Sequence, residues 1–268
     1  MAEVDIAGLG VWSQKFADWP AFRTGMKTGE WSTGAALQPD LIPPRKRRRV
    51  PQLVKMAIEV MDQACKMASL KPDDVAVVFS SSMGDMQITD YMCRTLAKTP
   101  ELISPTHFHN SVHNAAPGYW SITTGTFAPT TAVSAYEFTP TMAFLEAAIQ
   151  VIEENTPVVL VTQEIAAPLP LMDICPSAHP FSAAFLLTPP GYGIPVACSL
   201  EFSFSERAVR WPELHPALCD DFATNTGARI LPLLTAIAGS TQPVDLSFPV
   251  SESSSLLLSL NPYCRKIR

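Results

Sequence analysis

The chain has 268 residues and a net charge of −6 at pH 7; 47% of its residues are hydrophobic and only 16% are charged. This composition excludes a disordered protein, because so much apolar surface has to be buried in a large core. The acidic balance excludes a dedicated nucleic-acid-binding protein. The N-terminal sequence lacks the features of a signal peptide and no apolar run is long enough to span a membrane, so we expect a cytoplasmic protein without a membrane partner.

Strands and helices are predicted to alternate along the first 190 residues. Val4 to Val11 predicts an opening strand, and residues 52–68 place apolar side chains on one face of a helix. A second helix is predicted from Met86 to Lys98. Further strands are predicted at residues 75–79, 131–135, 158–162 and 180–189. This alternation is typical of a layered α/β domain.

The stretch from Thr131 to Glu164 predicts a short strand, a sharp corner, an amphipathic helix and a second strand. Such a corner presents one side chain at a helix N-terminus, where nucleophiles are often found. The helix is expected to bury the face that carries Met142, Leu145, Ile149 and Ile152.

The part of the chain after residue 190 is less regular. The expected elements are a strand, a helix and a last strand, at residues 196–206, 225–239 and 244–248. We predict a domain at residues 1–190, a C-terminal extension at 191–260 that packs on the same domain, and a tail at 261–268.

The cysteines are scattered and include no CxxC pair. We therefore expect reduced thiols, and neither a zinc site nor a disulfide framework is predicted. The positions are Cys65, Cys93, Cys175, Cys198, Cys219 and Cys264.

A basic run, Arg45 to Arg49, is the sharpest local charge feature. By itself it would suit a nuclear localisation signal or a phosphate-binding patch. Because the rest of the chain is acidic and the run precedes a helix, a solvated patch or a contact for an acidic partner is favoured.

His107, His109 and His113 form an HxHxxxH pattern, in which the last two would share one face of a helix. Metal ligation is one alternative, but no carboxylate lies nearby, so hydrogen-bonding or interface histidines are favoured. The SSSMGD stretch at residues 80–85 lacks the lysine and second glycine of a phosphate loop, and there is no GxSxG elbow. We predict no metal and no cofactor.

The order of these motifs resembles the N-terminal half of a β-ketoacyl synthase of the thiolase-like fold. VDIAGLGVWS is similar to the opening strand, VAVVFSSSMGD to a later strand and its loop, and SPTHFHNSVHNAAPGYWSITTG to a segment near the dimer interface. EAAIQVIEENTPVVLVTQE and SAHPFSAAFLLTP resemble the helix and strands that follow the nucleophile. The likeness covers about residues 1–190 and implies half of a thiolase-like fold, an α/β layered mixed sheet with helices on both faces.

The resemblance places the family's catalytic cysteine about ten residues before Ala147, where this chain has Glu137 between Tyr136 and Phe138. A carboxylate is stabilised at a helix N-terminus, but a mixed anhydride is a poor acyl intermediate. A shift of one residue would place Tyr136 or Phe138 there, and neither is a suitable nucleophile. The resemblance therefore implies a pseudo-active-site position at Glu137 and no catalytic residue.

The family's two catalytic histidines come from its C-terminal half, whereas only His215 lies beyond residue 179 of this chain. The paired donors that stabilise the enolate from a malonyl-thioester are therefore missing. A synthase-like chain without the cysteine resembles the chain-length factors, and this truncated form resembles the companion subunits of aryl-polyene systems. The resemblance implies a heterodimer with a ketosynthase, open to higher assembly, in which residues 131–135 pair with the partner's equivalent strand.

In such a complex, a set of residues in this chain would line the partner's acyl tunnel or the interface; alternatively, they are ordinary core or interface residues. Arg47, Arg48 and Arg49 would contact a transiently bound acidic acyl carrier protein. The tunnel and interface candidates are Phe108, Val112, His113, Asn114, Tyr119, Trp120, Tyr136 and Phe138.

Three functions are compatible with the sequence. The favoured one is a non-catalytic subunit that helps to shape the acyl tunnel of a ketosynthase during polyene or polyketide elongation on acyl carrier protein. A second is a thioester-processing enzyme that uses Glu137 in place of the cysteine, as a general base or decarboxylation aid. A third is a structural scaffold for the ketosynthase, without influence on product length.

Overall fold

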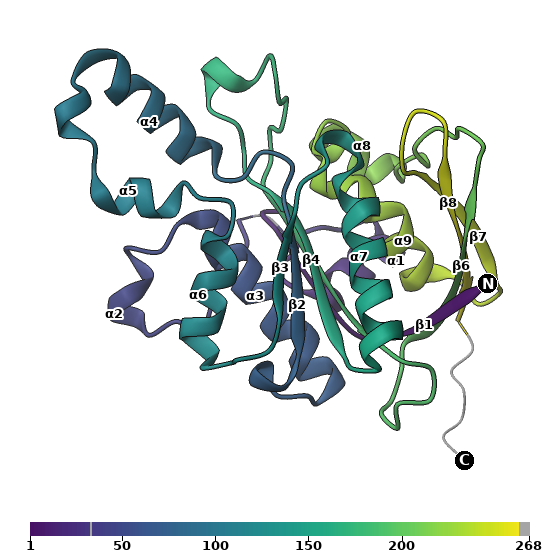
Figure 1. The fold of residues 1–268 in the computed structure, drawn as a ribbon. Helices are drawn as coiled ribbons and strands as arrows, with labels where there is room; N and C mark the ends of the chain where they lie inside the picture. Colours follow the sequence, from purple (N-terminus) through teal and green to yellow (C-terminus); the bar gives the residue numbers. More distant parts are fainter. Residues whose placement is uncertain (33, 263–268) are drawn as a thin grey trace.

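One mixed sheet of eight strands organises the protein in the computed structural model, which describes residues 1–32 and 34–262 (Figure 1). The strand order across the sheet is β3-β2-β4-β5-β1-β6-β8-β7. The strands are β1 (Ala2–Ser13), β2 (Ala76–Ser80), β3 (Thr130–Val133), β4 (Val158–Glu164), β5 (Phe181–Thr188), β6 (Cys198–Ser205), β7 (Val244–Pro249) and β8 (Ser255–Asn261).

Three neighbouring strands run in the same direction, because β2 pairs parallel with both β3 and β4. The other neighbouring strands pair antiparallel. The carboxyl ends of parallel strands meet at one edge of a sheet, which is where α/β proteins place their functional groups. We call this edge, made of residues 81–85, 134–138 and 165–180, the carboxyl edge.

Helices cover both faces of the sheet (Figure 1). α3 (Gln52–Ala68) and α6 (Ala115–Thr124) contribute to the core on one face, and α1 (Trp19–Thr28), α7 (Thr139–Glu154) and α9 (Leu231–Gly239) to the core on the other. The remaining helices are α2 (Pro44–Arg47), α4 (Met86–Lys98), α5 (Pro105–Asn110) and α8 (Pro216–Phe222). These layers confirm the predicted α/β class, a mixed sheet with helices on both faces.

Two glycines of β1 allow α3 to lie directly on the sheet. A Cβ atom at Gly8 would overlap the backbone oxygen of Ala64. At Gly10 it would overlap the backbone oxygen of Val60. Only a residue without a side chain permits this approach, which places α3 directly against β1.

The predicted helices at residues 52–68 and 86–98 coincide with α3 and α4, and the seven predicted strands match observed strands to within two residues at each end. The predicted buried face of α7 is correct for Leu145, which lies in the core, and for Met142, which packs against it, but wrong for the other two residues. Ile149 and Ile152 are 51% and 41% exposed, whereas Phe144, Ala148 and Val151 lie in the core. The fully buried residues of α7 include Ala143, Ala147 and Ala148, and small side chains allow a helix to pack closely on a sheet.

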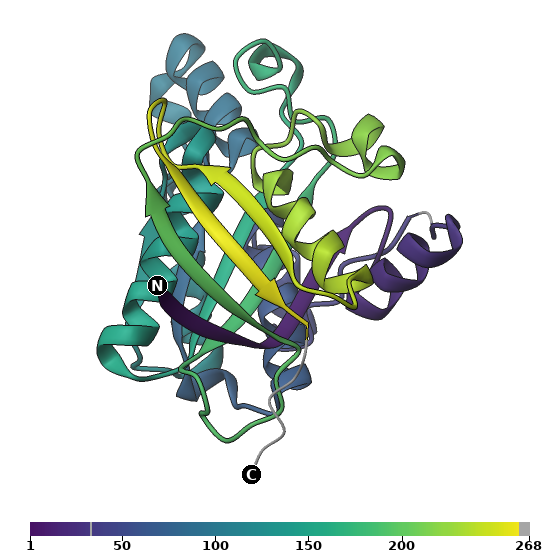
Figure 2. The same cartoon turned by 90° about the vertical axis from the view of Figure 1, so that its right-hand side faces the viewer.

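The C-terminal extension continues the same sheet (Figure 2). β6 pairs with β1, and β8 lies between β6 and β7. β8 has no counterpart among the predicted strands, and its last residue, Asn261, is where the predicted tail begins. The tail from residue 263 onward lies outside the described residues. Among the described residues, no helix has both the length and the hydropathy that crossing a membrane requires.

Candidate functional site

A sharp corner joins β3 to α7 at the carboxyl edge. Tyr136 has a φ of 49°, in the left-handed region that residues with a side chain rarely adopt. Thr139 braces this conformation, because its Oγ1 accepts the N–H of Ala135 at 2.9 Å and donates to the carbonyl of Tyr136 at 2.6 Å. The strained position of the corner is thus one residue before Glu137, the predicted pseudo-active-site position.

Glu137 is held by a cation from the C-terminal extension. Arg229 Nη1 lies 3.0 Å from Glu137 Oε2 and also donates to the main-chain carbonyl of Glu137 at 3.3 Å. The guanidinium lies 4.7 Å from the centroid of the Trp211 ring, a cation–π contact that supports its position. The corner carboxylate therefore has a charged, hydrogen-bonded partner within the chain.

The corner, residues 134–139, contains no cysteine. Elsewhere, burial raises the pKa of the Cys65 and Cys198 thiols to about 12, and it raises the pKa of Cys175 in the loop after β4. Thiols with raised pKa values stay protonated at neutral pH and are weak nucleophiles. Cys264 lies outside the described residues.

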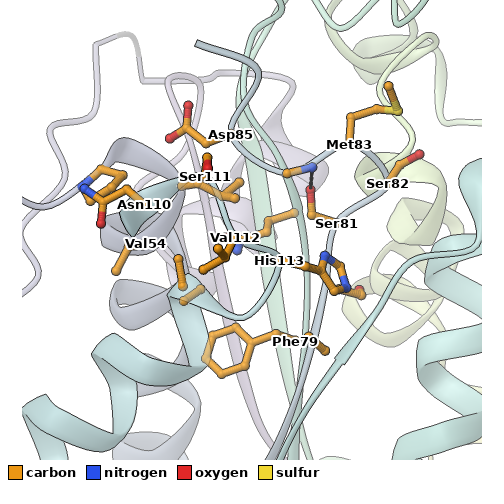
Figure 3. A pocket seen from close by; sticks show the side chains of 18 residues that line it. Val54, Phe79, Ser81, Ser82, Met83, Asp85, Asn110, Ser111, Val112 and His113 are labelled. Carbon is orange, nitrogen blue, oxygen red and sulfur yellow. Dashed lines mark hydrogen bonds between the residues drawn. The ribbon is translucent and has the colours of Figure 1, made fainter. Parts of the chain in front are cut away.

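A cavity of about 310 Å³ opens at the carboxyl edge (Figure 3). Its walls come from the N-terminal end of α3, the loop after β2, the segment between α5 and α6, and β3. Among the side chains that line it are Val54, Phe79, Ser81, Asp85, Asn110, Val112, His113 and Ala132. Its volume is at the lower end of the range of small-molecule pockets, about 300–1,000 Å³.

The loop after β2 is anchored by a buried carboxyl group at the end of β4. Glu164 accepts a hydrogen bond from Ser81 Oγ at 3.0 Å and another from the N–H of Ser82. Burial raises the pKa of Glu164 to about 7. Ser134 Oγ in turn donates to the carbonyl of Ser82 at 2.8 Å, so the same loop joins Glu164 to the corner.

Sequence reasoning did not identify Glu164 as part of the site. The feature that could have identified Glu164 is its position as the last residue of β4, a strand that is buried along its whole length. Buried carboxylates need hydrogen-bond donors, which indicates a polar loop opposite the strand end. The loop itself was recognised as a stretch that is not a phosphate loop and as similar to the loop after a strand of the synthase family, but not as a partner of Glu164.

The predicted tunnel residues lie in three different environments. Val112 and His113 line the cavity, while Phe108 on α5 is 61% exposed. Asn114 precedes α6, and the Tyr119 hydroxyl donates to Asn110 Oδ1 at 3.1 Å. Trp120 is fully buried in the core beside α3. At the corner, Tyr136 is 62% exposed and Phe138 is partly buried.

The arginines of the basic run differ in their contacts. Arg47 donates from Nε to the carbonyl of Ile42 at 2.7 Å and pairs with Asp40 at 3.3 Å. Arg48 and Arg49 line a groove of about 540 Å³ next to the N-terminus of α3. The three arginines that were predicted to act together therefore have different roles: one fixes its own loop, and two face a groove.

The three clustered histidines do not converge. The His107 ring stacks on Tyr91 with 4.1 Å between centroids, and His109 lies edge-on to Tyr119 at 6.3 Å. His113 lines the cavity instead. Within residues 1–32 and 34–262, no group of three or more His, Cys, Asp or Glu side chains is placed to hold a metal ion.

Solved structures share this fold. The ketosynthase ApeO in complex with its chain length factor ApeC from Xenorhabdus doucetiae has 19% identity and a TM-score of 0.69, with 97% of this chain and 100% of that chain covered. The ishigamide ketosynthase/chain length factor has 12% identity and a TM-score of 0.72, with 98% and 99% covered. A type II polyketide synthase structure, AntDE:AntF, has 13% identity and a TM-score of 0.72, with 98% and 100% covered. At these identities the likeness establishes the thiolase-like fold alone.

No curated protein matches the sequence. The family profile described as β-ketoacyl synthase, N-terminal domain, matches residues 19–217. The match spans most of the chain and includes the corner, the loop after β2 and the segment between α5 and α6. The resemblance inferred from the sequence is thereby confirmed, and the chain belongs to the β-ketoacyl synthase N-terminal domain family.

Proposed function

We propose that the protein is a non-catalytic subunit, similar to a chain-length factor, that forms a heterodimer with an active ketosynthase and helps to shape its acyl tunnel. The observation that carries the proposal is the corner, where Glu137 pairs with Arg229 at 3.0 Å. Acyl transfer through a ketosynthase requires a thiolate at such a corner. A carboxylate with an arginine partner does not supply one, so the reactive cysteine would come from the partner.

The edge strand β3 supports a partner on this side of the sheet. Among the described strands, β3 pairs with β2 alone, and all four of its residues are partly exposed. An edge strand is a template for pairing with a strand of another chain. Exposed apolar side chains flank it, because Ile122 is 78% exposed and Phe127 is fully exposed. Burial of these groups would favour a stable interface.

The position of the cavity supports an influence on product length. Ala132 of β3 contributes to its wall, so the cavity adjoins the edge that we assign to the partner. Val112 lines the cavity and is 44% exposed, and Phe108 on α5 is 61% exposed. Side chains that face a partner at this edge would limit the depth of an acyl tunnel formed between the two chains.

The similar solved structures support the same partners. Two are of a ketosynthase with a chain length factor, and the third contains an acyl-carrier protein with its ketosynthase. The positive charge of the basic run suits an acidic carrier protein. We assign the contact to Arg48 and Arg49, because the guanidinium groups of both make no ion pair with the described residues.

Co-expression with a candidate partner ketosynthase tests the proposal, by size-exclusion chromatography and elongation assays on each subunit and on the pair. We expect a one-to-one complex whose activity requires the cysteine of the ketosynthase. A homodimer of this chain that turns over thioesters alone would contradict the proposal and favour an enzyme that uses Glu137. A complex whose product length does not respond to Phe108→Ala or Val112→Ala would favour a structural scaffold.

A further inference from the structure

A buried carboxyl group lies against the loop after β2, which we call the flap (residues 81–85). Glu164 is completely buried and makes no ion pair with the described residues. Its hydrogen-bond donors belong to the flap. Ser81 Oγ donates at 3.0 Å, the N–H of Ser82 donates to the other oxygen, and the N–H of Met83 also faces the carboxyl group. The flap therefore both covers Glu164 and satisfies it.

Both ends of the flap are fixed. Ser80, the last residue of β2, donates from Oγ to the carbonyl of Val161 at 2.8 Å. Met86, the first residue of α4, is buried. Between these ends, Ser81 Oγ accepts the N–H of Gly84 at 2.9 Å (Figure 3). A movement of the flap is thus confined to the short segment between β2 and α4.

The charge of Glu164 determines how favourable the closed flap is. Burial raises its pKa from 4.5 to about 7, although the donors of the flap oppose that rise. When the flap is open, water solvates the carboxylate and its pKa returns toward the ordinary value. The closed form therefore binds the proton more tightly than the open form does. A rise in pH from about 4.5 to about 7 favours opening, and a further rise changes little.

The titratable groups around Glu164 do not neutralise its charge. Cys175 faces it from the loop after β4, and burial together with the charge of Glu164 raises the pKa of this thiol. Asp85, at the end of the flap, accepts the N–H of Ile88 at 3.1 Å and is itself acidic. Arg229 lies on the segment that packs against the backbone of Glu164, but it is paired with Glu137. Ionisation of Glu164 therefore leaves a buried negative charge without a cation among the described residues.

The flap is connected to two other parts of the carboxyl edge. All of its residues line the cavity of about 310 Å³ (Figure 3). The carbonyl of Ser82 accepts a hydrogen bond from Ser134 Oγ, directly after β3, at 2.8 Å. Opening of the flap would remove one wall of the cavity and break this bond, so the cavity and the end of β3 would change together.

We propose that the flap is operated by a proton: it stays closed over Glu164 while the carboxyl group is protonated, and ionisation of this group opens the flap and the cavity behind it. The device regulates access to the cavity and requires neither a partner nor chemistry at Glu137. It meets the proposed function only at the end of β3, the edge that we assign to the ketosynthase.

Hydrogen exchange of the full-length protein, followed by mass spectrometry at pH values between 5 and 8, tests the device. Protection of the amide groups of the flap, corrected for the intrinsic pH dependence of exchange, should fall by at least about tenfold from pH 5 to pH 7. In Glu164→Gln, which cannot ionise, it should change by less than about twofold. Amide groups of β4 should keep their protection throughout, which excludes global unfolding as the cause. Equal pH responses of the flap in the two proteins would overturn the proposal.

Three variants identify the titrating group and the connection to β3. Asp85→Asn and Cys175→Ser remove the neighbouring titratable groups and should keep the response of the wild type. A response that is lost in Asp85→Asn and kept in Glu164→Gln would assign it to Asp85 and contradict the proposal. Ser134→Ala should keep the response of the flap but abolish the matching change at residues 130–134.

Ser81→Ala provides a second test that does not depend on the folding of Glu164→Gln. It removes one donor to the carboxyl group, so protection of the flap should be lower than in the wild type at each pH and should still fall as the pH rises. Protection that is independent of pH in a folded Ser81→Ala variant would contradict the proposal. Size-exclusion chromatography with the ketosynthase at one pH reports the proposed function separately, and melting temperatures show whether each variant is folded.

Discussion

Arg229 and Glu137 are 92 residues apart in the sequence, yet their side chains meet at 3.0 Å where β3 turns into α7. The segment that carries Arg229 is fixed on the sheet, because a Cβ atom at Gly227 would lie 2.8 Å from the carbonyl carbon of Gln163. Asn225 adds a hydrogen bond from Nδ2 to the carbonyl of His179 at 2.8 Å. The C-terminal extension therefore supplies the charge that the corner carboxylate faces.

Glu137→Gln is expected to leave elongation by the ketosynthase complex unchanged, because the proposed thiolate belongs to the partner. The loss of stability should be below about 1 kcal/mol, since both side chains of the ion pair are partly exposed. Urea unfolding and turnover of the purified complex measure the two quantities. Glu154→Gln, an exposed glutamate at the end of α7, is the control. Loss of turnover in an intact complex of Glu137→Gln alone would assign a catalytic role to Glu137.

Glu164 should make the stability of the protein depend on pH. Its pKa is raised from 4.5 to about 7 by burial, so the folded state binds the proton more tightly than the unfolded state does. Stability relative to Glu164→Gln should therefore fall as the pH rises from about 4.5 to about 7 and change little above that range. The variant keeps a carbonyl oxygen that can accept from Ser81 or Ser82.

Urea unfolding of both proteins at several pH values between 4.5 and 8 measures this difference. Glu153→Gln on the exposed side of α7 controls for the general effect of a removed charge. A free-energy difference between wild type and Glu164→Gln that stays constant across the range would contradict the assignment.

The layered fold was predictable because strand and helix periods are local properties of the sequence. Residues 52–68 and 86–98 carry clear helical patterns, and both helices were predicted with the observed ends. β8 was missed because its run Leu256–Leu258 has no alternation in sequence, although in the structure Leu256 and Leu258 are buried and Leu257 between them is 39% exposed. Ile149 and Ile152 were wrongly assigned to the buried face of α7, because the periodic pattern describes the helix alone, whereas the side that packs closely also depends on the surface of the sheet.

The candidate site was predictable only in part. Glu137, Val112 and His113 were identified from the order of motifs, but the partner of Glu137 was not. Arg229 lies in a segment without a clear pattern, and a contact across 92 residues depends on the tertiary fold. The left-handed backbone of Tyr136 has no sequence signal either, because tyrosine has no preference for that conformation.

Trp120 and Phe108 should respond differently to truncation. Trp120 is fully buried, so Trp120→Ala should cost about 3–5 kcal/mol of unfolding free energy through lost burial and a cavity. Phe108 is 61% exposed, so Phe108→Ala should change the stability of the isolated chain by less than about 0.5 kcal/mol. Urea unfolding of the two variants checks both values. Phe108 is therefore the better probe of product length, since its effect is not confounded by unfolding.

The surface around β3 should be needed for binding to the ketosynthase but not for folding. Ile122 and Phe127 are 78% and fully exposed, so a charge at either position meets solvent in the isolated chain. Burying that charge at an apolar interface without a partner is costly, and each of Ile122→Asp and Phe127→Asp should weaken the complex by at least about tenfold. Melting temperatures should stay at the wild-type value.

Leu169→Asp is the matched control, because Leu169 is 89% exposed on the loop after β4 and lies outside the surface around β3. Affinities from titration of each variant into the ketosynthase give the comparison. If all three substitutions weaken the complex equally, the effect is one of general charge and the partner does not bind at β3. If only Leu169→Asp does, the interface lies at the carboxyl edge, and the corner rather than the edge strand faces the ketosynthase.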